Sequence, residues 1–354
     1  METLSPKQTG EAPTAAAPHA QGVDPRTLRA AAERGDPAAR LELGGRLLVG
    51  RDGIAADPAE GMQLVRTALD QGHAEAFNLM ATLTAAGAWT EHSWPRALDL
   101  LCAAAERGSA DARIQLRLIA GDRERAAAVE QGVVADADVW RRLRASVDLE
   151  RFVQPPQPVP KCDSPRIWTA DGFATPGECD WLIERARGKL QPAKMYDRAE
   201  RVTRFNAIRN NSDYFFNVVE SGLLMVLLRV RISLLVSLPV PHMEPPQMLH
   251  YAPGQELRAH FDFLRDNDSA YGENNYQGDR VVTFLLYLNE GYEGGHTHFI
   301  RADLRHRGRR GDALFFANLK GGEPDRMSLH SGTPVESGEK WLLSQWIHDR
   351  PFTA

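Results

Sequence analysis

The chain has 354 residues, of which 43% are hydrophobic and 25% are charged. This length exceeds that of one average domain, and the composition excludes a fibrous or wholly disordered protein, so we expect two folded domains and a tail. The near balance of 42 basic and 47 acidic residues, a net charge of −5, gives no indication of a nucleic-acid partner.

Two stretches bear on targeting and membrane insertion. Residues 1–23 are rich in alanine, proline and small polar residues and lack the apolar core of a signal peptide, so we expect a disordered tail. The most apolar run extends from Leu223 to Val240, but it contains Arg229, Arg231 and Pro239. Charged side chains are costly at the centre of a bilayer. This run therefore predicts a buried helix, and we expect no membrane association.

The cysteines indicate the redox compartment. Cys102, Cys162 and Cys179 are odd in number and form no Cys-x-x-Cys pair, which favours ordinary thiols in a reducing compartment. A bridge between Cys162 and Cys179 stays open as an alternative. We expect a cytoplasmic protein.

A repeating pattern occupies residues 24–125. Three segments of the form Ala-x-x-x-Gly end at glycines 37 and 36 residues apart, and each glycine is followed four residues later by an alanine: Gly35 and Ala39, Gly72 and Ala76, Gly108 and Ala112. A fixed period in this range is typical of an α-helical solenoid, in which each helix pair packs against the next. Glycine recurs because it can adopt the left-handed conformation after a helix C-terminus.

These units resemble Sel1-like repeats. The first carries Leu43-Gly44, Gly50, Gly53-Ile54 and Asp57-Pro58, whereas the second departs from the pattern in its loop at 87–95. The resemblance implies a short array of helix pairs whose concave surface could bind a protein partner.

A second domain follows a linker at 126–160, which is helical at first and ends in the Pro-rich stretch Gln154–Pro160. Consecutive prolines end a helix and favour extended geometry, so we place the domain boundary there. Residues 161–354 begin with two predicted helices, and turn signals then alternate with short apolar runs. These runs predict strands at Gln247–Tyr251, Val281–Leu288, Ala313–Ala317 and Trp341–Ile347. We expect an α+β protein whose second domain is a barrel or jelly roll with flanking helices.

A candidate metal site lies in this second domain. In the stretch His260-Phe-Asp262, residues i and i+2 of a strand point to one face, so both side chains can reach one metal ion. This match alone is weak in a chain with eleven histidines. A third ligand, His330, follows seventy residues later, and two histidines with one carboxylate are the facial ligand set of non-haem iron oxygenases. The remaining positions suit 2-oxoglutarate and dioxygen, with Lys340 as cationic partner of the distal carboxylate.

The same stretch resembles the catalytic core of the prolyl 4-hydroxylase family of Fe(II)- and 2-oxoglutarate-dependent oxygenases. The matching motifs occur in the family's order from about 165 to 352, and they are Tyr251-x-x-Gly254, His260-x-Asp262, Tyr287-Leu-Asn289, Gly294-Gly295-x-Thr297-x-Phe299, Gly311-Asp-Ala-Leu-x-Phe316 and the block from His330 to Trp341. The resemblance implies a double-stranded β-helix (jelly-roll or cupin-like) fold. It also implies iron ligation by His260, Asp262 and His330, Lys340 on the C5 carboxylate, and Tyr251 lining the cosubstrate pocket. Fe(II), 2-oxoglutarate and O2 are the implied cofactors, with L-ascorbate as an auxiliary reductant.

Other residues and the substrate are less constrained. His296 and His298 depart from the family pattern, and we favour a strand near the mouth of the site over iron ligation. The insertion 265–279 has the composition of a loop and suggests a lid, while Trp341 and Trp346 are expected to fill the barrel core. A prolyl residue of a peptide or protein is the first choice of substrate. A free amino acid or other small molecule is the alternative, and a non-catalytic adaptor based on the repeats is a third.

Overall fold

The computed structural model describes residues 23–133, 138–193, 209–264 and 278–352, and at 195–197 and 202–204 it describes the backbone alone. These residues belong to two compact units, Met1–Gln71 and Gly72–Ala354. The predicted disordered tail lies, except for Val23, outside the described residues, and so does most of the predicted lid.

The first unit contains the helices α1 (Pro25–Glu33), α2 (Pro37–Val49) and α3 (Pro58–Asp70). Each begins with a proline, which is preceded by an aspartate whose carboxylate accepts a hydrogen bond from the first turn. Helices α2 and α3 approach closely at Gly44 and Gly61, where a Cβ atom on either residue would come within 2.9 Å of the other's carbonyl oxygen. A side chain at either position would separate the two helices.

The second unit begins with helical repeats. Its described part opens with α4 (Ala74–Ala86), α5 (Trp94–Glu106), α6 (Ala110–Ile119), α7 (Arg123–Glu130), α8 (Val139–Ala145) and α9 (Leu149–Val153). The repeat glycines Gly72 and Gly108 have φ angles of +81° and +101°, which is the left-handed conformation expected after a helix end. The predicted array of helix pairs is confirmed.

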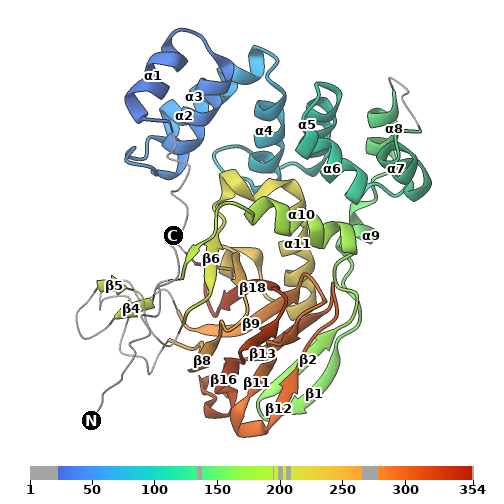
Figure 1. The fold of residues 1–354 in the computed structure, drawn as a ribbon. Coiled ribbons are helices and arrows are strands. Elements are labelled where there is room, and N and C mark those ends of the chain that lie inside the picture. Colours follow the sequence, from blue (N-terminus) through green and yellow to red (C-terminus); the bar gives the residue numbers. More distant parts are fainter. Residues whose placement is uncertain are drawn as a thin grey trace, which may run out of the picture. The chain divides into compact units, whose positions relative to one another are not determined.

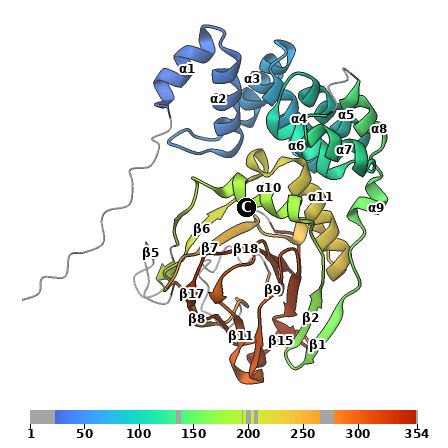
Figure 2. The same ribbon diagram turned by 45° about the vertical axis from the view of Figure 1, so that its right-hand side comes forward.

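The rest of the second unit forms two antiparallel sheets. The larger has the strand order β1-β2-β13-β9-β18-β7-β6-β3, and the smaller has the order β12-β11-β16-β8. Figure 2 looks into the barrel, with β7, β18 and β9 of the larger sheet along the top and right of the opening and β8 and β11 of the smaller sheet along its left and bottom. The predicted jelly-roll architecture is confirmed. The strands are β1 (Val159–Asp163), β2 (Arg166–Ala170), β3 (Gln191–Pro192), β6 (Ser212–Phe215), β7 (Gln247–Tyr251), β8 (Leu257–His260), β9 (Arg280–Tyr287), β11 (Thr297–Phe299), β12 (Leu304–His306), β13 (Ala313–Ala317), β16 (His330–Gly332) and β18 (Lys340–His348).

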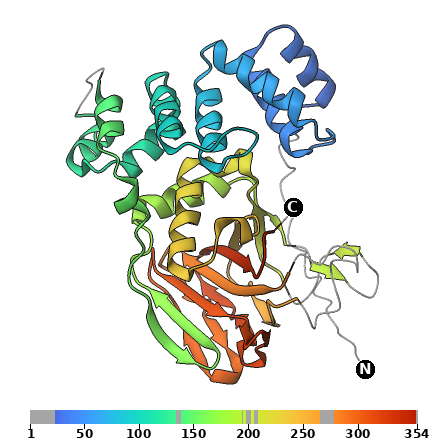
Figure 3. The same ribbon diagram turned by 180° about the vertical axis from the view of Figure 1, so that it is seen from behind.

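Both faces of the larger sheet are buried along its central strands β7, β9, β13 and β18, where alternate residues point to opposite sides. Leu249, Leu285 and Leu342 belong to the core between the two sheets. Met248, Phe284, Leu286 and Leu343 point the other way, into a core shared with the helices α10 (Pro176–Ala186) and α11 (Val218–Val236). Figure 3 shows these helices between the barrel and the helical repeats of the same unit. The candidate site lies inside the barrel.

Helix α11 also joins the repeats to the barrel, and here the structure departs from the predicted domain boundary. The helix is interrupted at Gly222, whose φ is +71°, and the backbone N–H of Leu224 donates to Oε1 of Gln115 in α6 at 2.9 Å. In α10, Trp181 Nε1 donates to Asp111 of α6 at 2.7 Å. The compact units therefore divide between Gln71 and Gly72, and not at the Pro-rich connector, because α4 and α6 pack on α10 and α11 (Figure 1).

Two further features concern the cysteines and the apolar helices. Cys102, Cys162 and Cys179 are free thiols, so the alternative bridge is not formed. Among the described helices, including the 19-residue α11, none combines the length and apolar character that crossing a bilayer requires.

Candidate active site

The three predicted metal ligands converge inside the barrel. His260 ends β8 and pairs in register with His330 of β16, and the centroids of the two imidazole rings are 4.2 Å apart. Asp262 follows β8, with Oδ1 at 3.5 Å from Nε2 of His260 and Oδ2 at 3.6 Å from Nε2 of His330. One ligand atom from each residue lies within 4.8 Å of the other two. The sequence spacing therefore translates into one cluster of donor atoms.

Hydrogen bonds on the far side of each imidazole fix its tautomer. Nδ1 of His260 lies 2.8 Å from the carbonyl oxygen of Arg258, and Nδ1 of His330 lies 3.0 Å from that of Ser328. A carbonyl only accepts, so each Nδ1 carries the proton and donates. The lone pair of each Nε2 is then directed at the centre of the cluster, an arrangement that metal-binding histidines commonly use.

The protonation states also suit a metal. Burial, together with the nearby charge of His260, lowers the pKa of His330 to about 4, which keeps that imidazole neutral near pH 7. Burial opposes ionisation of Asp262, but attraction to the protonated forms of His330 and His260 and a hydrogen bond from His260 outweigh it, so the pKa of this carboxyl lies well below its usual range. Two imidazole nitrogens and one carboxylate form a donor set that fits a divalent first-row metal such as Fe(II).

A buried hydrogen-bond relay orients the carboxylate. Thr283 of β9 donates from Oγ1 to Oδ2 of Asp262 at 2.7 Å, and Asn318 donates from Nδ2 to the same Thr283 oxygen at 2.9 Å. All three side chains are buried. Because Oδ2 already accepts a hydrogen bond, Oδ1 is the oxygen more available to coordinate a metal ion. The relay also fixes the carboxylate plane. Neither Thr283 nor Asn318 was identified from the sequence.

Replacing Thr283 with valine should weaken metal binding roughly 10- to 100-fold, because partners that orient metal ligands typically contribute that much. Valine keeps the shape of the side chain and removes the donor. Titration with Co(II), followed by its visible absorption, measures the affinity without any turnover. Thr283→Ser is the matched control, since it retains the hydroxyl. If the valine variant binds Co(II) as tightly as the serine variant, the relay does not orient Asp262.

A cavity of about 330 Å³ extends from the cluster between the sheets. Its apolar walls include Leu249, Leu285 and Leu342. Lys340 also lines it; this side chain is only 1% exposed, and its Nζ donates to the carbonyl oxygen of Gly295 at 2.6 Å. No other hydrogen bond of this ammonium group is formed within the described residues, so two N–H groups are available to a ligand.

Tyr251, which was expected to line the cosubstrate pocket, lies beside Lys340. The two residues are paired in register across β7 and β18, and the Tyr251 ring centroid lies 5.3 Å from Lys340 Nζ. Burial raises the pKa of Tyr251 to about 12, so its hydroxyl stays neutral. Lys340 and Tyr251 therefore form one polar end of a cavity that also contains the metal cluster.

His296 and His298 point away from the cavity. Thr297, between them, lines the cavity, and alternation along β11 directs its neighbours outward. Nε2 of His298 is 3.8 Å from Oδ1 of the exposed Asp303. Among the described residues, the metal cluster consists of His260, Asp262 and His330.

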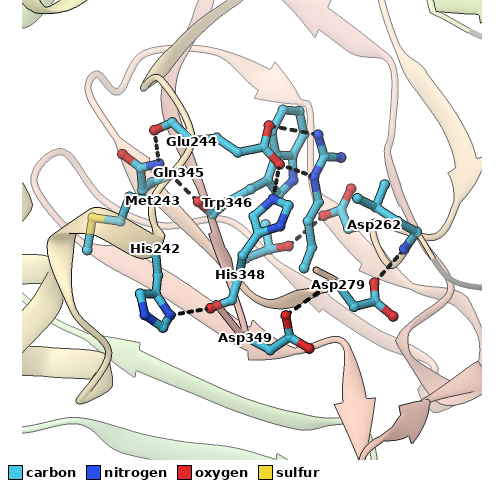
Figure 4. A network of polar contacts seen from close by, with 12 residues as sticks. His242, Met243, Glu244, Asp262, Asp279, Gln345, Trp346, His348 and Asp349 are labelled. Atoms are coloured by element: carbon cyan, nitrogen blue, oxygen red, sulfur yellow. Dashed lines mark hydrogen bonds and ion pairs between the residues drawn. The ribbon is translucent and has the colours of Figure 1, made fainter. Parts of the chain in front are cut away.

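An arginine that the sequence did not single out also lines the cavity. The guanidinium of Arg280 lies 3.7 Å from the centroid of the Trp346 ring, and its Nη2 donates to Glu244 at 2.9 Å. Figure 4 shows Glu244 beside His348 and Trp346, and Nε2 of His348 is 2.7 Å from the Glu244 carboxylate. Trp346 is half-buried at the cavity wall. Trp341 is buried, but in the core shared with the helices and not inside the barrel as expected, because alternate residues of β18 point to opposite faces.

Comparison with known proteins gives three findings. The family model described as 2OG-Fe(II) oxygenase superfamily matches residues 246–348. The chain is 31% identical over 223 residues to probable prolyl 4-hydroxylase 4 of Arabidopsis thaliana, which covers 57% of this chain and 73% of the relative. Solved structures similar to parts of the chain include a viral collagen prolyl hydroxylase from Paramecium Bursaria Chlorella virus-1 (26% identity, 52% of this chain and 97% of that one, TM-score 0.40). They also include a Sel1 repeat protein from Oxalobacter formigenes (26% identity, 38% and 96%, TM-score 0.26).

Proposed function

The chain belongs to the prolyl 4-hydroxylase family of 2OG-Fe(II) oxygenases, and on that premise we propose that it hydroxylates a prolyl residue of a peptide or protein. In the proposed reaction a substrate C–H bond becomes C–OH, while 2-oxoglutarate and O2 become succinate and CO2. Fe(II) supplies the redox chemistry of this coupled oxidation when bound. Arabidopsis relatives of the chain are named as prolyl 4-hydroxylases, which supports this choice of substrate.

The proposed roles of the side chains follow from their positions. His260, Asp262 and His330 hold the metal through two Nε2 atoms and one carboxylate oxygen. Lys340, at the polar end of the cavity, binds the C5 carboxylate of 2-oxoglutarate. Tyr251 lines that end as a neutral side chain. The leucines on the cavity walls exclude water, which strengthens the ion pair at Lys340.

One observation carries the proposal: a complete metal-ligand cluster and a buried, incompletely hydrogen-bonded lysine line the same cavity. Burying such groups without partners costs free energy and contributes nothing to packing. This cost argues against a purely structural barrel, and so against the adaptor alternative.

A turnover screen tests the proposal. Purified protein with Fe(II), 2-oxoglutarate and ascorbate is offered proline-containing peptides and free amino acids, and succinate and hydroxylated product are both quantified. We expect a peptide to yield hydroxylated product in proportion to succinate. The Asp262→Ala variant should form neither. Hydroxylation of small molecules alone would replace the peptide proposal with its alternative. Three further expectations remain predictions: a need for ascorbate, a protein partner on the repeats and a cytoplasmic location.

The affinity for 2-oxoglutarate should depend on pH through Lys340. Burial lowers the pKa of Lys340 to about 7, and the dianionic ligand binds the protonated amine. Above pH 7 the ligand-free protein loses this proton, so the affinity should fall by roughly tenfold per pH unit; below pH 7 it should level off. Titration of 2-oxoglutarate into Mn(II)-loaded protein at about pH 6.5 to 8.5 measures the effect. A profile as steep in Lys340→Met would assign the titration to another group.

A further inference from the structure

A second polar cluster lies on the cavity wall formed by β6 and β7, away from Lys340. It consists of Arg209, Asp213 and Gln247. Nη2 of Arg209 and Nε2 of Gln247 both donate to Oδ2 of Asp213, at 2.8 Å and 2.7 Å. Figure 2 shows β6 beside β7, and Asp213 pairs with Leu249 across the two strands. Arg209 and Gln247 line the same cavity as the metal cluster.

The orientation of the Gln247 amide is fixed by Asp213. The carboxylate accepts hydrogen bonds, so the amide must present its N–H group to Asp213 and direct its oxygen elsewhere. That oxygen, Oε1, is buried and has no hydrogen-bond partner among the described residues, and the whole side chain is 0% exposed. A buried acceptor without a partner is unfavourable. A ligand N–H would relieve this cost.

Arg209 supplies the complementary donor. Its Nε donates to Asn211 and one Nη group donates to Asp213, while the other Nη group forms no hydrogen bond within the described part of the chain. The side chains of Arg209 and Asp213 are only 11% and 12% exposed. Because the carboxylate neutralises the guanidinium at close range, the cluster offers one donor and one acceptor with no net charge.

A neutral donor–acceptor pair suits a peptide group better than it suits the ends of a free amino acid. A free α-carboxylate would need an uncompensated cation, and Asp213 already compensates Arg209. Proline inside a peptide has no backbone N–H, so of the two peptide bonds that flank it only the one that follows can donate a hydrogen bond to this acceptor. The cluster therefore matches a proline inside a chain.

We propose that Arg209, Asp213 and Gln247 form the subsite that binds the peptide backbone beside the target proline. Gln247 Oε1 accepts the N–H of the residue after the proline, and Arg209 donates to a peptide carbonyl oxygen. This assignment rests on the proposed prolyl hydroxylase function and narrows it: internal prolines are substrates, whereas free proline and C-terminal proline are poor ones.

A backbone-ester substrate tests the acceptor. The parent probe is acetyl-Ala-Ala-Pro-Ala-Ala-amide, and in its analogue lactate replaces the alanine after proline, which removes one N–H without adding bulk. For the wild type, the ester should raise KM roughly 5- to 150-fold, the range for leaving a buried acceptor unpaired. In Gln247→Met, parent and ester should have the same KM. Melting temperature and Co(II) affinity verify that this variant is folded.

A charge variant tests the neutrality of the cluster. Wild type should prefer acetyl-Ala-Ala-Pro-amide over the same peptide with a free carboxylate. Asp213→Asn preserves the shape of the side chain but leaves Arg209 uncompensated, so this preference should shrink or reverse. An ester penalty that persists in Gln247→Met, or a preference that Asp213→Asn leaves unchanged, overturns the subsite while peptide hydroxylation stands. If wild type hydroxylates none of these peptides, the proposed function itself fails.

Discussion

Replacing Asp262 with alanine should abolish metal binding and reduce succinate formation to background. The carboxylate lies between the two imidazoles, with oxygens 3.5 and 3.6 Å from their Nε2 atoms, and it is the one anionic group of the cluster. Without it, the two imidazoles face each other and offer only two ligand atoms to a divalent ion. Isothermal titration with Mn(II) and metal analysis of the purified protein give readouts independent of substrate. The same protein assayed with 2-oxoglutarate gives the turnover.

Asp303→Ala is the matched control for this variant. Asp303 also lies beside a histidine, with Oδ1 at 3.8 Å from Nε2 of His298, but it is exposed and on the outer side of the barrel. The control should bind metal and turn over like the wild type. Asp262→Ala should remain folded, because the loss of one accepted hydrogen bond from Thr283 costs about 1–3 kcal/mol. Stoichiometric metal in Asp262→Ala, or its loss in the control, would refute the ligand assignment.

The metal cluster could be predicted from sequence because the pattern is largely local. His260 and Asp262 share a face through strand periodicity, and the order of motifs through His330 and Lys340 matched a known family. The structure brings these residues together by pairing β8 with β16 and β7 with β18. Such pairings follow once the jelly roll is assumed. The prediction of the site residues therefore depended on the prediction of the fold.

The residues that support the site could not be predicted. Thr283 stands in the apolar strand Arg280–Tyr287, where its hydroxyl gives no sign that it points inward to Asp262. Arg280 and Glu244 are 36 residues apart, and no spacing rule links them. Trp346 was expected in the core because tryptophan is usually buried, but Arg280 stacks on it at the cavity wall. These contacts depend on side-chain packing between distant strands.

The position of the domain boundary could not be predicted for a similar reason. Asp111 and Gln115 are four residues apart in α6, and their spacing is typical of polar residues on a helix surface. In the structure they bind α10 and α11, across separations of 70 and 109 residues. Gln115 satisfies the backbone N–H of Leu224 just after the interruption at Gly222. A cut at the Pro-rich connector would therefore remove a partner of the barrel's own helix, whereas a cut before Gly72 would not.

Replacing Lys340 with methionine should raise the Kd for 2-oxoglutarate by at least roughly 30-fold, because truncating one partner of a buried charged pair costs about 2–5 kcal/mol. Methionine has a similar length and an apolar end. Replacing a buried charged group with an apolar one of similar size is often neutral or stabilising, and within the described residues the one acceptor that loses a hydrogen bond is the Gly295 carbonyl. The melting temperature should therefore change little while cosubstrate binding is lost.

A cosubstrate analogue separates this role from a general effect on the cavity. 2-Oxopentanoate keeps the 2-oxo acid that a metal would bind and lacks the C5 carboxylate. It should bind weakly to the wild type, and Lys340→Met should weaken it no further, because the interaction with Nζ is already absent. Removing the C5 carboxylate and removing Nζ then abolish the same interaction, so their effects on binding do not add, as expected for two groups in direct contact. If the variant weakens 2-oxopentanoate as strongly as 2-oxoglutarate, Lys340 shapes the cavity and does not bind the distal carboxylate.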